Sequence, residues 1–242
     1  MLKTPIMHSF GRTDRGLVRS ENEDCFHMDE ANAVFAVADG LGGLPEGSLA
    51  SEVAIAELKN WLKDTLPPGP IDYSHLFSLI NEEVFKRGRE ISSELGIGTT
   101  LTVAHLHGKT LTAGHVGDTG LVIFKQDSWR QVTQDHTMAQ EMLDRLHPGE
   151  EAFIPEYFSH TLTRCIGQTD KIQTDVYRET LDEDDRILLF TDGVTKTMDI
   201  DELHELIFEA DSPQAFVDMV IDTANERGGP DNTTAIAIFL ET

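Results

Sequence analysis

The sequence predicts a single α+β domain over residues 1–242. Apolar, partly β-branched runs of strand length occur along the chain, and two of them end in an Asp-Gly pair. Segments with apolar residues at helical spacing lie between these runs. No linker rich in proline, glycine or serine divides the chain, and its length is sufficient to bury a sizeable core.

Strands come first, and two long helices follow. Residues 5–13 and 33–39 have the composition of strands, and the polar segment 11–24 is predicted to connect them. A helical period covers residues 47–66, and the proline-rich run that follows ends this helix. A second helix is predicted over residues 73–95, where glycines stop it.

The middle of the chain is predicted to be a strand meander. Residues 99–106 and 110–117 flank a hairpin turn that contains glycine, and residues 121–124 continue the meander. A short capped helix is predicted over residues 135–146. The irregular segment 147–160 is predicted to be a surface loop or lid, although its aromatic residues have the simpler interpretation that they pin it down.

Two further strands, residues 171–177 and 186–192, flank an acidic turn at residues 181–185. This turn lacks the glycine and the late glutamate of a calcium-binding EF-hand loop. It is therefore predicted to be solvated.

The end of the chain combines helices with a closing strand. A helix is predicted over residues 199–209, and a second helix begins at Pro213, with Ser212 as its cap. This second helix ends at Gly228, and residues 233–240 form the last strand.

Composition excludes several classes of function. The chain has 43 acidic and 19 basic residues, and the resulting formal charge of -24 disfavours non-specific binding to nucleic acid or to an anionic membrane. Cys25 and Cys165 provide neither a disulfide framework nor zinc spacing. No apolar stretch approaches the ~20 residues of a membrane span. We expect a cytoplasmic monomer that binds no nucleic acid.

Three carboxylates lie at strand edges far apart in the sequence. Asp39 and Asp192 end apolar runs and precede a glycine, and Asp231 stands just before the last strand. For any one of them, a plain turn is the simpler interpretation. Together they indicate a hard-cation site with oxygen ligands, to which Gly40 adds a backbone carbonyl.

Two further features extend this pattern. Arg19 precedes the carboxylate pair Glu23 and Asp24, and its guanidinium offers a bidentate donor for a phosphate beside an acidic pole. Asp118 lies in a turn flanked by glycines, where a ligand role and a plain turn remain equally good interpretations.

Eight short motifs occur in one order along the chain. They are Arg-(three residues)-Glu-Asp at 19–24, Ala-Asp-Gly-Leu-Gly-Gly at 38–43, Gly-Thr-Thr at 98–100, Val-Gly-Asp at 116–118, Asp-His at 135–136, Leu-Thr-Arg-Cys-Ile-Gly at 162–167, Thr-Asp-Gly-Val at 191–194 and Gly-Gly-Pro-Asp-Asn-Thr-Thr at 228–234. In these motifs the chain resembles the metal-dependent protein serine/threonine phosphatases of type 2C, in their compact bacterial form.

This resemblance implies a four-layer α-β-β-α sandwich with two central antiparallel sheets and a dinuclear Mn²⁺ or Mg²⁺ site. It implies that Asp39 bridges both ions, that Gly40 offers its carbonyl, and that Asp192 and Asp231 complete the shell of one ion. Asp24, with Glu23 behind it, holds water on the other ion. Arg19 binds the substrate phosphate, and Asp118 contributes to a third, weaker metal site.

The implied reaction is the hydrolysis of phosphoserine and phosphothreonine on proteins by a metal-activated water, without a nucleophilic side chain. Phosphoproteins, and by analogy a bacterial Ser/Thr kinase that the enzyme opposes, are the implied partners. Two departures from the family pattern stand out. Leu41 replaces the histidine of many eukaryotic relatives, a candidate proton donor, and Gly120 replaces an arginine near Asp118.

Two alternatives remain. The first is a catalytically inactive relative that acts as a phosphoprotein-binding regulatory module, but such proteins usually lose a metal ligand. The second is a haloacid-dehalogenase-like enzyme with a phospho-aspartate intermediate. That mechanism needs Asp-x-Asp, and position 41 is leucine.

Overall fold

The computed structural model describes residues 6–42, 46–65, 71–92, 94–147, 150, 152–169 and 171–241. Some features named above lie outside these residues: position 5 of the first predicted strand, Gly43 of the second motif, residue 66 of the first predicted helix with the proline-rich run that follows it, residue 93 of the second predicted helix, and residues 148, 149 and 151 of the predicted lid.

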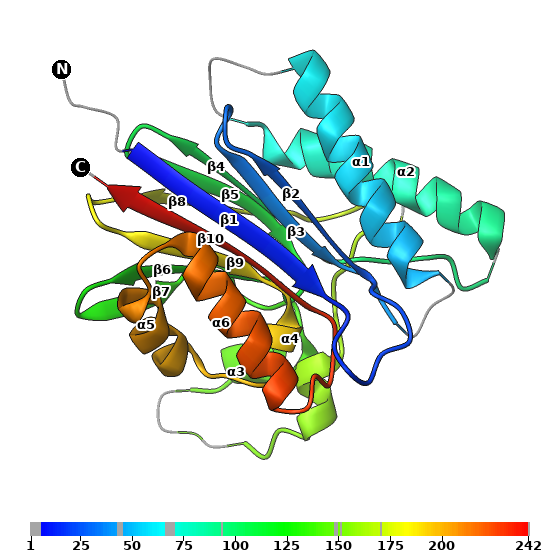
Figure 1. Cartoon of the computed structure of the whole chain (residues 1–242). Coiled ribbons are helices and arrows are strands. Elements are labelled where there is room, and N and C mark those ends of the chain that lie inside the picture. The colour runs from blue at the N-terminus through cyan, green and yellow to red at the C-terminus, as the bar shows by residue number, and fades with distance from the viewer. Residues whose placement is uncertain are drawn as a thin grey trace.

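Two five-stranded sheets form the centre of the molecule, and every strand pair in them is antiparallel (Figure 1). The first sheet has the order β1 (Ile6–Asp14), β10 (Thr233–Glu241), β9 (Arg186–Phe190), β6 (Gly120–Lys125) and β7 (Ser128–Gln131). The second sheet has the order β2 (Asp24–Asp29), β3 (Val34–Asp39), β4 (Leu101–His107), β5 (Thr110–Val116) and β8 (Asp175–Thr180).

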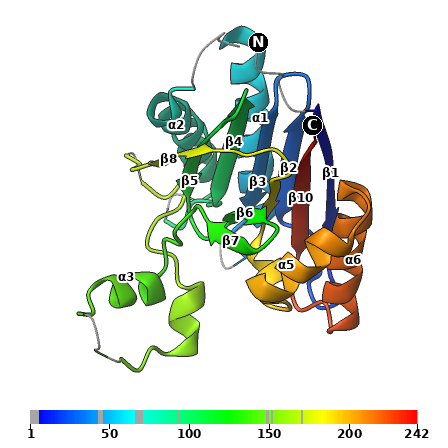
Figure 2. The same ribbon diagram turned by 90° about the vertical axis from the view of Figure 1, so that its left-hand side faces the viewer.

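Helices surround the two sheets, and the longer ones cover their outer faces. The helices are α1 (Gly47–Thr65), α2 (Tyr73–Ile91), α3 (Met138–Asp144), the 3₁₀ helix η1 (Glu156–His160), α4 (Asp192–Thr195), α5 (Ile200–Glu209) and α6 (Pro213–Glu226). Figure 2 shows α1 and α2 on one side of the sheets, α5 and α6 on the other, and α3 projecting away from them. The predicted four-layer α-β-β-α sandwich is confirmed.

Three apolar clusters correspond to the three interfaces between layers. One joins α1 and α2 to the second sheet, one joins α5 and α6 to the first sheet, and the third fills the space between the sheets. The predicted helix stripes supply the outer clusters, with Leu58 and Leu76 in one and Val217 and Ile221 in the other. Among the described residues, no helix has both the length and the apolar character that crossing a membrane requires.

Two strands were missed by the sequence patterns. β2 begins at Asp24, inside the predicted connection, and its residues do not alternate between buried and exposed. All four residues of β7 are exposed, so that strand has no apolar face to reveal it. The first strand was predicted to end at residue 13 and continues to Asp14, so the connection begins only after Asp14.

The predicted meander is wrong at β6. β4 and β5 form the expected hairpin, but β6 pairs with β7 and β9 in the other sheet. The chain therefore crosses between the sheets in the turn that carries Asp118. A strand's own residues predict its conformation but not its partner, because pairing depends on segments distant in the sequence.

Smaller differences concern boundaries and one turn. α2 ends at Ile91, where Ser92 caps it, instead of at residue 95, and β8 covers Asp175–Thr180 instead of 171–177. The acidic turn at 181–185 is not fully solvated. Asp185 is only 2% exposed, and its carboxylate accepts a hydrogen bond from the backbone N–H of Asp182.

Candidate active site

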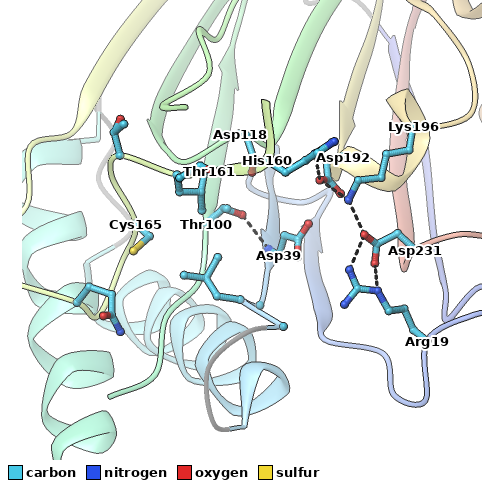
Figure 3. A pocket seen from close by; sticks show the side chains of 16 residues that line it. Arg19, Asp39, Thr100, Asp118, His160, Thr161, Cys165, Asp192, Lys196 and Asp231 are labelled. Atoms are coloured by element: carbon cyan, nitrogen blue, oxygen red, sulfur yellow. Dashed lines mark hydrogen bonds and ion pairs between the residues drawn. The ribbon is translucent and has the colours of Figure 1, made fainter. Parts of the chain in front are cut away.

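The candidate site lies at one edge of the sandwich, where strands of both sheets end. Asp39 is the last residue of β3, Asp192 begins α4 directly after β9, and Asp231 precedes β10. Asp118 lies in the turn between β5 and β6. With Arg19, these side chains line one pocket of about 760 Å³ (Figure 3). The fold thus brings together carboxylates that are separated by most of the sequence.

Backbone hydrogen bonds hold Asp39 at the end of its strand. Its N–H donates to the hydroxyl of Thr100 at 2.9 Å, and its carbonyl accepts from the N–H of Thr100 at 2.8 Å. Gly40 follows, and its N–H donates to the carbonyl of Glu23 at 3.1 Å. A Cβ at Gly40 would lie 2.3 Å from the carbonyl oxygen of Gly47, so only glycine fits there. The carboxylate of Asp39 faces the pocket.

Asp24 is the cross-strand partner of Asp39, but it is not among the side chains that line the pocket. It is 8% exposed, and its Oδ2 accepts hydrogen bonds from the hydroxyls of Thr191 at 2.8 Å and Thr234 at 2.6 Å. Its Oδ1 is buried and has no hydrogen-bond partner within the described parts of the chain. Burial raises the pKa of Asp24 to about 7, although the two hydroxyls lower it.

A lysine without a predicted role joins two of the carboxylates. Lys196 Nζ lies 2.6 Å from Asp192 Oδ2 and 2.5 Å from Asp231 Oδ2. Arg19 holds Asp231 from the other side, with Nε 2.7 Å from Oδ1 and Nη2 2.8 Å from Oδ2 (Figure 3). Burial alone would raise the pKa of Asp231, but these two cations outweigh it and hold the pKa below its ordinary value.

The other carboxylates of the site repel one another. Burial, followed by the charges of Asp24 and Asp192, raises the pKa of Asp39 well above its ordinary value. Burial and the charge of Asp192 also raise the pKa of Asp118 to about 7 and that of Asp135 to about 6. The site therefore favours any ligand that brings positive charge.

Glu23 and Arg19 lie beside the loop that follows Asp39. A Cβ at Gly42 would come within 2.6 Å of Glu23 Oε2 and 2.7 Å of Arg19 Nη1, and a Cβ at Gly47 would come within 2.3 Å of Glu23 Oε1. The N–H of Glu23 also donates to Asn232 Oδ1 at 2.8 Å. Glu23 thus lies behind the site and does not line the pocket. A residue that supports a ligand from behind is expected in such a position.

The turn that carries Asp118 is fixed without the arginine that Gly120 replaces. The N–H of Gly117 donates to His136 Nδ1 at 3.0 Å, and the N–H of His136 donates to the Gly117 carbonyl at 2.7 Å. A Cβ at Gly120 would lie 2.0 Å from the Phe190 ring. Glycine is therefore required by packing, and His136 of the Asp-His motif supplies the connection that holds the turn.

The predicted lid reaches the pocket through its last residue. His160, at the end of η1, lies with Nδ1 4.0 Å from Asp192 Oδ2 and lines the pocket. Phe153 is 89% exposed and Tyr157 is 65% exposed. The interpretation that aromatic residues pin this segment to the body is therefore wrong for these two side chains. No motif marks His160, because its place in the pocket depends on the fold of η1 and not on its neighbours in the sequence.

The donor atoms fit hard divalent cations. Each candidate ligand offers oxygen, the atom that Mg²⁺ and Mn²⁺ prefer. Asp24 Oδ1 and Asp192 Oδ1 are buried acceptors without a hydrogen-bond partner among the residues that the structure describes. In that same part of the chain, no three acidic, histidine or cysteine side chains converge closely enough to hold an ion. Lys196 and Arg19 contact carboxylate oxygens of Asp192 and Asp231, and these carboxylates would have to turn toward a bound ion.

Comparisons with known proteins agree with this geometry. The family model described as "Protein phosphatase 2C" matches residues 17–241. The chain is 29% identical to a protein named serine/threonine phosphatase stp from Listeria innocua, over 96% of this chain and 95% of that protein. It is also 29% identical to protein phosphatase PhpP of Streptococcus pneumoniae, over 94% and 95% of the two chains.

Among solved structures, the catalytic domain of the serine threonine protein phosphatase PstP in complex with 2 manganese ions is similar, with a TM-score of 0.83 and 27% identity. The alignment covers 98% of this chain and 99% of that domain.

Proposed function

The chain belongs to the protein phosphatase 2C family, and from this premise we propose that it hydrolyses phosphoserine and phosphothreonine on proteins at the pocket around Asp39. The observation that carries the proposal is the meeting of Asp39, Asp118, Asp192 and Asp231 from both sheets around one opening. Four carboxylates and an arginine in one pocket match the needs of a metal-dependent phosphoester hydrolase.

Two Mn²⁺ or Mg²⁺ ions are the proposed cofactors, and the relative solved with two manganese ions supports a site for divalent metal. Asp39 would contact both ions, with Asp192 and Asp231 on one of them and Asp24 on the side of the other. The carbonyl of Gly40 is a further proposed ligand, and Asp118 is proposed for a third, weaker site. When bound, such ions make a water more acidic and stabilise the charge of the phosphoryl group.

Residues of the chain would bind the substrate and position the metal ligands. Arg19 would bind the phosphate of the substrate, and the elements that hold Asp39 keep its carboxylate in the pocket before substrate arrives. Leu41 lines the pocket where many eukaryotic relatives have histidine, so protonation of the leaving group falls to another group. His160 lines the same pocket, with Nδ1 4.0 Å from Asp192 Oδ2.

Arg19→Ala is expected to raise KM for a phosphopeptide about tenfold, with a smaller effect on kcat, because a bidentate donor to phosphate is lost. Arg15→Ala is the matched control, since Arg15 lies in the same loop and donates only to the backbone of Ser20 in the described structure. Steady-state kinetics on both variants measures the difference. An unchanged KM in Arg19→Ala would remove its assigned role.

The alternative of an inactive regulatory module is separated from the enzyme by turnover. Purified protein with millimolar Mn²⁺ should release phosphate from p-nitrophenyl phosphate and from phosphoserine or phosphothreonine peptides. Failure on every such substrate, in protein that binds phosphopeptides, would favour the binding module. The comparisons with named phosphatases favour the enzyme.

The substrates are proposed to be phosphoproteins modified by a bacterial Ser/Thr kinase that the enzyme opposes. The bacterial relatives named serine/threonine phosphatases support this by analogy. A comparison of phosphoproteomes with and without the enzyme would identify these substrates.

The acidic site also predicts how stability depends on pH when metal is absent. The pKa values of Asp24 and Asp118 are raised from 3.8 to about 7, and that of Asp135 to about 6, so the folded chain keeps protons that the unfolded chain releases. The stability from these groups is complete below the ordinary aspartate pKa and is lost as the pH rises toward 7. In chelator, the melting temperature should therefore fall from about pH 4 to about pH 7.

Mn²⁺ should raise the melting temperature more at the upper end of this range. Asp135→Asn should flatten the pH dependence in chelator, because an amide does not titrate. Asp127→Asn, at an exposed hairpin position, should leave the slope unchanged. A melting temperature that rises with pH over this interval would contradict the expected coupling.

A further inference from the structure

We propose that Lys196 is a built-in cation that competes with the metal for Asp192 and Asp231 and so weakens metal binding at this half of the site. The inference rests on the proposed function, because it concerns two of the proposed ligands. It assigns to Lys196 a role that none of the sequence motifs predicted.

The contacts of Lys196 carry the inference. Its ammonium lies between the two carboxylates, 2.6 Å from Asp192 Oδ2 and 2.5 Å from Asp231 Oδ2. These are the two side chains proposed to complete the shell of one ion. A divalent ion held by the same two carboxylates would lie close to the ammonium, and the two positive charges would repel each other. Binding of the ion therefore favours displacement of the lysine.

The placement of Lys196 follows from the local fold. Asp192 begins the short helix α4, and Lys196 caps its end, one turn later on the same face. The backbone N–H of Lys196 donates to the Asp192 carbonyl at 2.9 Å, which fixes the spacing of the two residues. The side chain is 24% exposed, so it has a path into solvent when it is displaced.

The lysine also has a use in the absence of metal. Asp192 and Asp231 have side chains that are only 17% and 12% exposed, and they would repel each other without a cation between them. Lys196 keeps the two strand ends together until metal arrives. The consequence is a lower apparent affinity, since it falls in proportion to the fraction of molecules whose site is open.

The test compares Mn²⁺ binding and stability in metal-free full-length protein. Lys196→Met and Lys196→Gln remove the charge while keeping much of the side-chain volume. Lys125→Met is the matched control, because Lys125 also joins two carboxylates, 2.5 Å from Asp182 and 3.5 Å from Asp185, on an exposed part of the surface away from the pocket. Calorimetric titration with Mn²⁺ gives the affinity, and thermal unfolding in chelator gives the metal-free stability.

We expect both Lys196 variants to bind Mn²⁺ about tenfold more tightly than the wild type, the change predicted if the lysine closes the site about nine tenths of the time. Their melting temperatures in chelator should be lower, and Mn²⁺ should restore them. Lys125→Met should keep the wild-type affinity.

Unchanged or weaker Mn²⁺ binding by folded Lys196 variants would overturn the inference. Weaker phosphopeptide binding with unchanged Mn²⁺ affinity would instead place the lysine on the substrate, and would also overturn it. Should the wild-type protein bind no Mn²⁺ at all, the proposed function itself would fail, so the two failures are distinguishable.

Discussion

Asp39→Asn is expected to lower kcat for p-nitrophenyl phosphate by about a hundredfold to a thousandfold. The substitution keeps the shape of the side chain but removes its charge. The charges of four other carboxylates, those of Asp24, Asp192, Asp118 and Asp231, add to burial in raising the pKa of Asp39. It is therefore the position where the charges of the site meet.

The fold should survive this substitution. The hydrogen bonds that hold Asp39 involve its backbone and Thr100, and not its carboxylate. In chelator at neutral pH, Asp39→Asn should melt at the same temperature as the wild type or higher, because a buried charge without a metal is destabilising. Loss of activity without loss of stability identifies a functional role.

Asp29→Asn is the control for Asp39→Asn. Asp29 lies at the other end of the β2–β3 hairpin, where its carboxylate accepts hydrogen bonds from Asn32. Its kcat should stay within about twofold of the wild type, because surface changes away from the site have small effects. Activity of Asp39→Asn close to that of this control would rule out a two-metal mechanism centred on Asp39.

Gly193→Ala is expected to damage both the stability and the site. A Cβ at Gly193 would lie 1.9 Å from the carbonyl oxygen of Asn232 and 2.9 Å from Thr233 Oγ1. Backbone cannot move aside cheaply, so the start of α4 and the start of β10 must separate. We expect a loss of about 1–3 kcal/mol in the free energy of unfolding. Asp192 and Asp231 lie on these two segments, so Mn²⁺ affinity should fall as well.

Gly108→Ala is the matched control for this substitution. Gly108 is at the tip of the β4–β5 hairpin, where a Cβ would meet no atom within 4 Å, although its φ of +60 favours glycine. This variant should lose about 1 kcal/mol and keep its Mn²⁺ affinity. Chemical denaturation and Mn²⁺ titration on both proteins separate general strain from damage at the site. Equal Mn²⁺ affinity in the two variants would contradict the expected separation of Asp192 from Asp231.

Much of the fold follows from local patterns in the sequence. Ser212 and Pro213 predict the start of α6, and the structure has both where they were expected, with the serine hydroxyl accepting from Ala215 N–H. The apolar runs that end at Asp39 and Asp192 are strands. The assignment of strands to sheets does not follow from them, because β6 pairs with β9, whose residues lie 62 to 70 positions further along the chain. The residues of β6 do not by themselves indicate which strand it pairs with.

Some residues of the candidate site could be predicted from the sequence, and others could not. Asp39, Asp192 and Asp231 could be selected from the sequence because each stands beside a turn at a strand edge, and the fold brings all three to one pocket. Lys196 could not be selected, since a lysine one helical turn after an aspartate is also common on a solvated helix. Asp24 was also selected from the sequence. Its hydrogen bond with Thr191 could not be predicted, because it depends on how the two sheets pack.

The position of the pocket between two sheets has a further consequence. Asp24 and Asp39 belong to the sheet covered by α1 and α2, whereas Asp192 and Asp231 flank strands of the sheet covered by α5 and α6. Ions held by both pairs would act as a non-covalent cross-link between the halves of the sandwich. Separation of either half would then release the metal, and metal would make the two halves unfold as one cooperative unit.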